Sequence, residues 1–275
     1  MVRVAYAVFY DGTKFNGFMG GAGSVYETLV RAFRQVLDLP DAESLDFTCA
    51  SRTDPGVSAL KNVIAVTLPR FVRPEELNSV LPDAVRVWAA AVVPDNFSAR
   101  SAYARVYVYL KEYEGEDVDL MRKCAKLFEG THDFSNFQII DKDASPVTTI
   151  YSIEVQHLGN IIMFKFVGQG FRNKMIRKIV WTLVQVGLGR LSIDYVRDLI
   201  ELKVRRTVPS APAEGLLLVD VLYRECPNFS ISERAVKEVV QYLRERLKIL
   251  RSTVLSLDYA FSLLISLLIE RVSKP

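Results

Sequence analysis

Hydrophobic and polar positions follow two different periods along the first 225 residues of the chain. Stretches rich in β-branched and aromatic residues predict strands, and apolar positions three or four residues apart predict amphipathic helices. The predicted strands are residues 2–10, 45–50, 59–68, 85–93, 103–113, 148–157, 161–167 and 216–223. The predicted helices are residues 24–36, 74–81, 118–129, 171–186 and 193–202. This mixture of strands and helices indicates an α+β fold.

The order of the elements predicts how they are arranged. Residues 1–100 read strand, helix, strand, strand, helix, strand, which is the order of a ferredoxin-like split βαβ unit. Residues 101–225 form a second α+β half, and no Ser/Gly-rich linker separates the two. We therefore expect two ferredoxin-like halves that share one continuous, mostly antiparallel sheet.

The last part of the chain, residues 226–275, has a different character and predicts a helical extension. Residues 230–249 form a charged amphipathic pattern that begins with a capping box, Ser230-x-x-Glu233. Residues 254–269 are nearly all apolar, but these sixteen residues include an Asp and are shorter than the ~20 residues of a bilayer span. We expect them to pack against the preceding helix or a second subunit rather than enter a membrane.

The composition is that of an ordinary globular protein and excludes some kinds of site. Half of the 275 residues are hydrophobic and 24% are charged. Cys49, Cys124 and Cys226 lie far apart, and the only histidines are His132 and His157, so neither a disulfide framework nor a metal site is indicated. The N-terminus lacks the apolar block of a signal peptide, so we expect a reduced, cytoplasmic protein.

The charge distribution indicates a polyanionic partner better than the net charge does. The formal net charge is only +3. Between positions 170 and 207, however, nine basic residues stand against three acidic ones, an excess that suits phosphate groups. The basic residues are Arg172, Lys174, Arg177, Lys178, Arg190, Arg197, Lys203, Arg205 and Arg206.

One short loop presents candidate chemistry. Residues 50–60 (ASRTDPGVSAL) place Arg52, Thr53 and Asp54 between two predicted strands, directly before a Pro-Gly turn. Tight loops between strands often carry functional groups. By composition alone, however, the simpler interpretation is a turn in which Asp54 accepts backbone N–H bonds and Arg52 forms a surface ion pair.

Four segments together are similar to a known family. Residues 51–59 (SRTDPGVSA) resemble the GRTDAGVHA signature of the TruA family of tRNA pseudouridine synthases. Residues 97–109 (FSARSAYARVYVY) resemble the family's FxAR…RxYxY segment, and residues 168–180 (GQGFRNKMIRKIV) resemble its GxGFLxxMVRxIVG helix. Residues 211–220 (APAEGLLLVD) resemble its APAxGLxLxxV ending. The resemblance covers all but about the last fifty residues and implies the pseudouridine synthase fold.

The resemblance implies a catalytic carboxylate. Pseudouridine formation breaks the uridine C1′–N1 bond and rejoins the uracil through C5, without a redox step or phosphate energy, so no cofactor is expected. The family uses the Asp of its RTD motif as nucleophile, which is Asp54 here. Arg177, from the family's helix motif, would keep this carboxylate ionised. Ser51, Pro55 and Ser58 depart from the Gly, Ala and His of the signature, but none of them replaces the nucleophile.

Further residues receive roles by the same resemblance. Tyr107 would stack on the target uracil, and Leu216 would close the other side of the pocket, although a strand tyrosine is ordinarily a core residue. Arg52 would help to hold the flipped-out nucleotide. The cations that flank Arg177 would contact phosphates of the tRNA anticodon arm, although a solvated helix face is an equal alternative. These cations are Arg172, Lys174 and Lys178.

The sequence thus predicts a tRNA pseudouridine synthase that acts as a homodimer on uridines 38 to 40 of the anticodon arm, as the family resemblance implies. One alternative is a non-catalytic RNA-binding relative of the family, against which the intact Arg52, Asp54, Tyr107 and Arg177 argue. Another is an α+β enzyme that uses a carboxylate on a small glycosidic substrate, which the basic helix disfavours.

Overall fold

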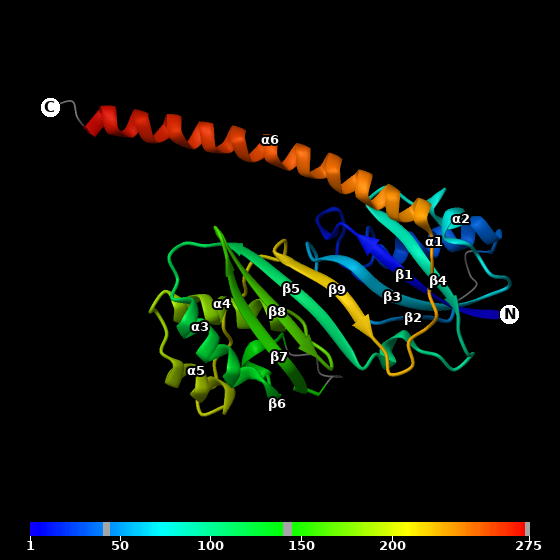
Figure 1. Cartoon of the computed structure of the whole chain (residues 1–275), viewed down its shortest axis with the longest axis horizontal. Helices are drawn as coiled ribbons and strands as arrows, with labels where there is room; N and C mark the ends of the chain where they lie inside the picture. Colours follow the sequence, from blue (N-terminus) through cyan, green and yellow to red (C-terminus); the bar gives the residue numbers. More distant parts are fainter. Residues whose placement is uncertain (41–44, 140–144, 273–275) are drawn as a thin grey trace.

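The structure of the chain is a computed structural model that describes residues 1–40, 45–139 and 145–272. Ten strands form one sheet in the order β10-β4-β1-β3-β9-β5-β8-β7-β6, and β2 pairs with β3 beside this path (Figure 1). The strands are β1 (Val2–Tyr10), β2 (Phe47–Cys49), β3 (Ser58–Leu68), β4 (Val85–Val92), β5 (Ala104–Glu112), β6 (Gly130–Asp133), β7 (Val147–Leu158), β8 (Ile161–Gly168), β9 (Leu216–Leu222) and β10 (Ser230–Ile231).

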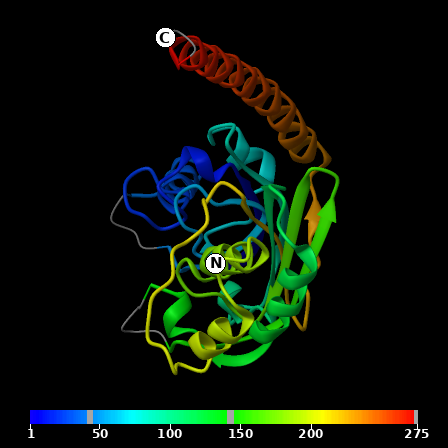
Figure 2. The same cartoon turned by 90° about the vertical axis from the view of Figure 1, so that its left-hand side faces the viewer.

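The helices lie mainly on one side of this sheet. Figure 2 shows α1, α4 and α5 on the same side. The helices are α1 (Val25–Leu37), α2 (Pro74–Asn78), α3 (Val118–Ala125), α4 (Met175–Gly187), α5 (Ile193–Ile200) and α6 (Glu233–Val272). Short 3-10 helices are η1 (Gly12–Lys14), η2 (Ala99–Ser101), η3 (Lys126–Phe128) and η4 (Ser135–Phe137).

Strands β1 to β4 and strands β5 to β9 meet at one pair, β3 with β9, which is the single parallel pair in the described part of the sheet. Ser58 and Ala59 of β3 pair with Leu217 and Leu218 of β9, whereas the other described pairs are antiparallel. The continuous, mostly antiparallel sheet of an α+β fold is therefore confirmed. The division of the chain at residues 100 and 225 into separate units stays a prediction. The seam between β3 and β9 begins just after the loop that carries Asp54.

The core fills the space between the sheet and its covering helices. The ring of Tyr6 on β1 packs 5.4 Å from that of Phe33 on α1, measured between centroids, and both side chains are fully buried. Ser24 begins α1 by accepting the N–H of Glu27, and the Glu27 carboxylate accepts the N–H of Gly23 at 2.7 Å. Strong N-capping and a buried apolar stripe together explain why α1 forms at the predicted residues.

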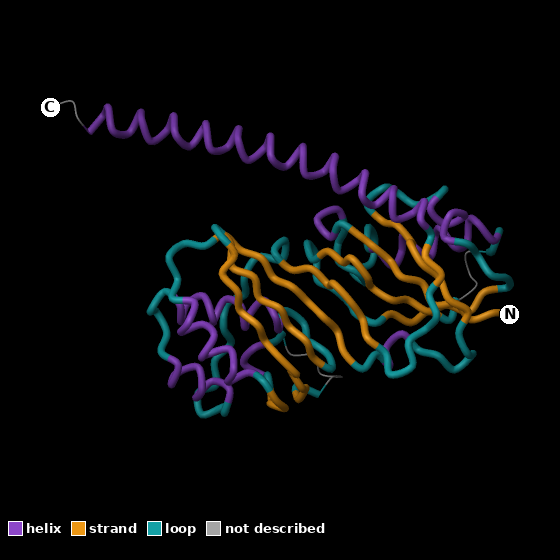
Figure 3. The backbone as a smooth tube through the Cα atoms, viewed as in Figure 1, coloured by secondary structure: helices purple, strands orange, loops and turns teal. Residues whose placement is uncertain are grey.

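The C-terminal extension differs from the prediction. Residues 233–249 and 254–269 belong to one continuous helix, α6, so the expectation that the second segment packs against the first is wrong (Figure 3). The reason is that residues 250–253 contain neither Gly nor Pro, so nothing ends the helix between the two segments. The cap of α6 is Ser232, whose hydroxyl accepts the N–H of Ala235, while Ser230 lies in β10.

Beyond its first turns, α6 leaves the body of the molecule (Figure 1). Its apolar side chains between residues 247 and 264 are exposed, with Leu255 and Tyr259 about two-thirds open to solvent. Within the described residues, no helix combines the length and the apolar character that crossing a membrane requires. Sequence patterns also missed the short strands β6 and β10, which are too brief to show a period.

Candidate active site

The loop between β2 and β3 is fixed by backbone hydrogen bonds to its surroundings. The Phe18 N–H donates to the Thr53 carbonyl at 3.0 Å, and the Val57 N–H closes a turn onto the Asp54 carbonyl at 3.1 Å. Gly56 has a φ of +88°, and a β-carbon there would lie 2.9 Å from that of Ala213, so this position requires glycine. The turn therefore presents Asp54 in one defined orientation.

Buried polar side chains of β1 and β3 also hold this loop in place. The hydroxyls of Tyr10 and Thr53 are 2.8 Å apart. The Asn62 side-chain amide donates to the Ser51 carbonyl at 2.9 Å and to the Tyr10 hydroxyl at 3.2 Å. Burial raises the pKa of Tyr10 far above its ordinary value, so its hydroxyl stays neutral and serves as a structural partner.

Asp54 meets the predicted cation. Nη1 of Arg177, in the first turn of α4, lies 3.0 Å from Oδ2 of Asp54. The Asp54 side chain is only 16% exposed and the Arg177 side chain only 13%. Nε of Arg177 donates to the Ala211 carbonyl at 2.8 Å, which fixes the guanidinium from a third segment. A half-buried carboxylate with a fixed cation beside it is well suited to act as an anion at the bottom of a cleft.

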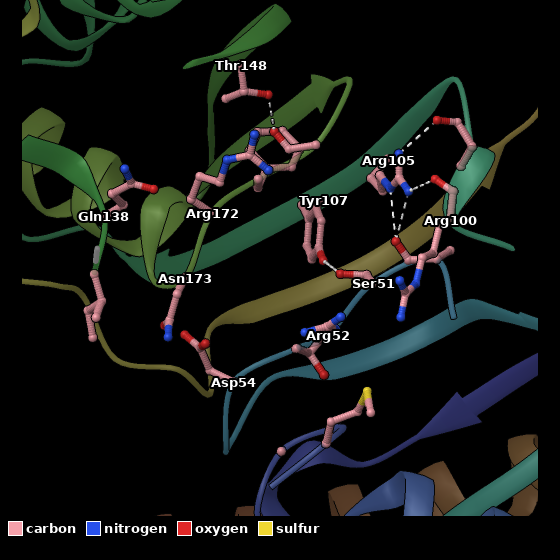
Figure 4. Close-up of a pocket in the computed structure, with 18 of the residues that line it drawn as sticks. Ser51, Arg52, Asp54, Arg100, Arg105, Tyr107, Gln138, Thr148, Arg172 and Asn173 are labelled. Atoms are coloured by element: carbon pink, nitrogen blue, oxygen red, sulfur yellow. Dashed lines mark hydrogen bonds between the residues drawn. The ribbon is translucent and has the colours of Figure 1, made fainter. Parts of the chain in front are cut away.

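Tyr107 on β5 lies beside this pair. Its ring is buried and meets the ring of Phe171 edge-on at 5.5 Å between centroids. Its hydroxyl is 2.6 Å from the Ser51 hydroxyl (Figure 4). Burial raises the pKa of Tyr107 to about 12, partly offset by the hydrogen bond with Ser51 and the charge of Arg105. The phenol is therefore neutral near pH 7 and can donate or accept a hydrogen bond.

A small cavity joins these groups at the bottom of a much larger cleft. The small cavity has about 50 Å³ and is lined by Asp54, Tyr107, Arg177 and Leu216 among others. The cleft above it has about 1630 Å³ and shares Asp54 and Tyr107 with the small cavity. In Figure 4 the side chains of Asp54 and Asn173 point toward one another across this region. We call the residues around the small cavity, Asp54, Tyr107, Arg177 and Leu216, the cleft floor.

The wider part of the cleft is basic. Arg52, Arg100 and Arg172 line it from three different segments, and we call these three residues the cleft rim. Arg52 and Arg172 also line the small cavity. Arg52 and Arg100 are exposed, and Arg172 is half-buried. Arg105 also lines the cleft, but its guanidinium donates to backbone carbonyls, including those of Ala50 and Arg100 (Figure 4). Arg105 therefore holds the wall together, and the rim offers its cations to a ligand.

Three comparisons place the chain among known proteins. The profile of a family described as tRNA pseudouridine synthase matches residues 124–224. The tRNA pseudouridine synthase A of Pyrobaculum neutrophilum is 43% identical over 238 residues, which are 86% of this chain and 88% of that protein. The protein of the same name from Pyrococcus abyssi is 38% identical over 252 residues, 90% of this chain and 94% of that one. The chain belongs to the tRNA pseudouridine synthase A family.

The family makes this protein an isomerase of the TruA type. The tRNA pseudouridine synthase A of Thermococcus sibiricus is 36% identical over 268 residues and matches 95% of this chain and 100% of that protein. A crystal structure of a Cbf5-Nop10-Gar1 complex matches 66% of this chain and 45% of that one, with 15% identity and a TM-score of 0.37. This likeness is too remote to inform the site.

Most of the site residues predicted for this enzyme come together in the structure. Asp54, Tyr107, Arg177 and Leu216 form the floor, and Arg52 lies at its edge. The order of strands in the sheet brings them together although they lie far apart in the sequence. Their roles in the reaction stay predictions.

The three predicted RNA-contacting cations differ in position. Arg172 faces the cleft, with Nη2 3.2 Å from the Val147 carbonyl. Lys174 lines the small cavity and has a φ of +60°, a conformation that is unusual for lysine. The structure contradicts the prediction that Lys178 contacts RNA. Lys178 is only 5% exposed, and its amine donates to the Gln138 carbonyl and the Thr207 hydroxyl. Burial lowers the pKa of Lys178, which is a structural residue rather than a phosphate contact.

Sequence reasoning missed two contributors to the site. Ser51 was noted only as a departure from the family signature, yet its hydroxyl contacts that of Tyr107. Arg100 belongs to the FxAR match, which could have identified it as a cleft residue. Within the described residues, no group of three or more His, Cys, Asp or Glu side chains is arranged to hold a metal ion.

Proposed function

We propose that Asp54 is the nucleophile with which this enzyme isomerises uridine to pseudouridine in tRNA. The observation that carries the proposal is the Asp54–Arg177 pair, 3.0 Å long, at the bottom of a basic cleft. The carboxylate attacks C1′ while the C1′–N1 bond breaks, and the pair of electrons leaves with the uracil. The turned uracil then displaces the carboxylate through C5. C5 loses a proton and N1 gains one, so the reaction is balanced without a redox partner.

Tyr107 and Leu216 would hold the base during this rearrangement. A uracil that leaves its stack loses contacts with neighbouring bases, and an aromatic face restores part of them. The neutral hydroxyl of Tyr107 is available for proton transfer at the base, since burial raises the pKa of Tyr107 to about 12. Arg52, exposed beside Asp54, would hold the flipped nucleotide or its phosphate.

The cleft suits an RNA arm better than a small metabolite. Small-molecule pockets have roughly 300–1,000 Å³, and this cleft has about 1630 Å³ with three arginines on its rim. We infer that the substrate is the anticodon arm of tRNA and that the modified uridines are those at positions 38 to 40. This inference rests on the family resemblance and on the rim, whose arginines would contact the phosphates around the flipped base.

We also propose that the enzyme works as a cytoplasmic homodimer. The apolar side chains of α6 between residues 247 and 264 are exposed, and contact with a second subunit would remove them from water. The three cysteines are free, which suits a reducing compartment.

The position of the modification can be tested directly. Purified enzyme is incubated with an unmodified tRNA transcript that has uridines at 38, 39 and 40, and pseudouridine is then mapped along the whole transcript. We expect pseudouridine only in this window. A matched transcript with cytidine at all three positions should bind and yield no product. Pseudouridine elsewhere would contradict the assignment to the anticodon arm, and binding without any product would favour the non-catalytic relative.

A further inference from the structure

The first turns of α6 pack against β4, α2 and the end of β1. Ala235 and Val239 are buried against the body, and the ring of Tyr242 meets that of Phe9 edge-on at 6.0 Å between centroids. From Leu247 onward the apolar side chains of the helix are largely exposed. The docked part of α6 thus ends at Arg246, one turn of helix after Tyr242.

Two side chains at the end of the docked part bind the same carboxylate. The Tyr242 hydroxyl donates to Oδ2 of Asp11 at 2.7 Å, and Nε of Arg246 lies 3.2 Å from the same oxygen. Nη2 of Arg246 also reaches the Thr13 hydroxyl at 3.2 Å. These contacts connect residues more than 230 positions apart in the sequence.

Asp11 in turn organises the short helix η1. Its Oδ1 accepts the N–H of Thr13 at 3.1 Å and the Thr13 hydroxyl at 2.6 Å. The Asp11 side chain is only 11% exposed. Burial alone would raise the pKa of Asp11, but the hydrogen bonds from Thr13 and Tyr242 and the charge of Arg246 lower it below its ordinary value. The carboxylate is therefore an anion that three groups from two segments hold in place.

The next residue, Gly12, touches the loop of the proposed nucleophile. The Gly12 carbonyl accepts the N–H of Gly56 at 3.2 Å, and the Gly12 N–H donates to the Ser58 hydroxyl at 3.0 Å. A β-carbon on Gly12 would lie 2.0 Å from the Val57 carbonyl oxygen, so the two backbones are in direct contact. Gly56 and Val57 form the turn that orients Asp54.

We propose that α6 is a positioning element of the active site, in which Tyr242 and Arg246 hold Asp11 so that Gly12 supports the turn behind Asp54. The proposal rests on the role of Asp54 proposed above. Catalysis is sensitive to displacements of about 1 Å, so a loosened turn lowers the rate even when the substrate still binds. Tyr242 and Arg246 do not line the cleft, and they act on the reaction only through Asp11 and Gly12.

The test compares single and combined variants in the full-length enzyme. Tyr242→Phe keeps the ring on Phe9 and removes only the hydroxyl, and Arg246→Met keeps the stem and removes the cation. For the double variant we expect kcat on tRNA to fall roughly ten-fold while KM changes less than about two-fold. Arg246→Lys should recover part of the loss. Arg244→Met, which removes an exposed cation from the same helix, should leave kcat unchanged and serves as the control.

Two readouts separate positioning from general stability. All rates are measured well below the melting temperature of each variant, so a fall in Tm with unchanged kcat would overturn the proposal. In the Asp11→Asn background, Arg246→Met should have little further effect on kcat, because both act through the same carboxylate. Full additivity would also overturn it. The two proposals fail in different ways. An active Asp54→Asn variant would show that the proposed nucleophile is wrong. An inactive Asp54→Asn variant, together with an unchanged kcat in the double variant of Tyr242 and Arg246, would overturn only the proposed role of α6.

Discussion

The floor and the rim of the cleft hold their charges in opposite ways. On the floor, Asp54 and Arg177 are each less than one-fifth exposed and form a direct pair. On the rim, Arg52 and Arg100 are exposed to solvent. A buried charge is stable only with a fixed partner, whereas an exposed cation can adapt to a phosphate backbone. The difference is consistent with our proposal that the floor performs the chemistry and the rim binds the RNA.

The same contrast appears in how the two parts are supported. The floor depends on backbone contacts from several segments, including the turn at Gly56 and the Arg177 bond to Ala211. The rim depends on a wall that Arg105 ties together through backbone carbonyls. Changes on the floor should therefore lower turnover, and changes on the rim should weaken binding and its salt dependence.

The largest effect is expected from Asp54→Asn. This change is nearly isosteric but removes the charge and the nucleophilic oxygen, so turnover should fall by roughly 10⁴-fold or more. The measurement is tritium release from tRNA labelled at uracil C5. Asp119→Asn, which alters an exposed carboxylate on α3, is the control and should behave like the wild type. Turnover by Asp54→Asn within about 10²-fold of the wild type would show that another group attacks C1′.

A smaller loss is expected from Arg177→Met. The variant keeps the packing of the stem but leaves Asp54 without its cation, which should lower kcat by about 10²-fold. Arg177→Lys restores the charge without the second bond to Ala211, so it should recover only part of the rate. The comparison uses single-turnover rates at saturating enzyme. Equal rates for all three proteins would mean that the pair does not take part in the reaction.

The rim should affect binding instead. Arg100→Met and Arg172→Met should each weaken the affinity for tRNA several-fold and reduce the slope of log K against log salt by about 1. Single-turnover rates at saturating enzyme should stay within about two-fold of the wild type. Arg70→Met, which removes an exposed cation outside the cleft, should leave the slope unchanged. An unchanged slope in the Arg100 and Arg172 variants would remove both residues from the RNA interface.

The smallest effect is expected from Ser51→Ala. The change removes the hydroxyl 2.6 Å from that of Tyr107 and nothing else. A hydrogen bond of this kind is worth about 1 kcal/mol, which corresponds to roughly five-fold in rate. The reduction should be seen in kcat with an unchanged KM, and Ser101→Ala on the same cleft wall serves as the control. A loss confined to KM would place Ser51 with the rim.

The sequence predicted most of the fold and the composition of the floor. Periodicity located the long strands and α1, and the matched motifs identified Asp54 and Arg177 although 123 positions separate them. The sequence could not show which cations of α4 face the cleft and which face the core. Consecutive helix residues point about 100° apart, so Arg177 facing the cleft turns Lys178 toward the core. A count of basic residues does not show this difference.

Long-range contacts were outside the reach of sequence patterns. The hydrogen bond between Ser51 and Tyr107 joins the loop between β2 and β3 to β5, and these two segments come together only in the folded sheet. The contact of Tyr242 with Asp11 joins the two ends of the chain. Local propensity carries no information on such pairs, because their side chains meet through tertiary packing alone.

The division of labour between floor and rim is tested most directly by the affinity of Asp54→Asn for tRNA across a range of salt concentrations. Because we expect the variant to be almost inactive, its dissociation constant should report binding alone. We predict a value within about three-fold of the wild type and the same salt slope, because the rim is intact. An affinity more than about 30-fold weaker, with a changed slope, would show that the floor itself holds the RNA and would contradict the account.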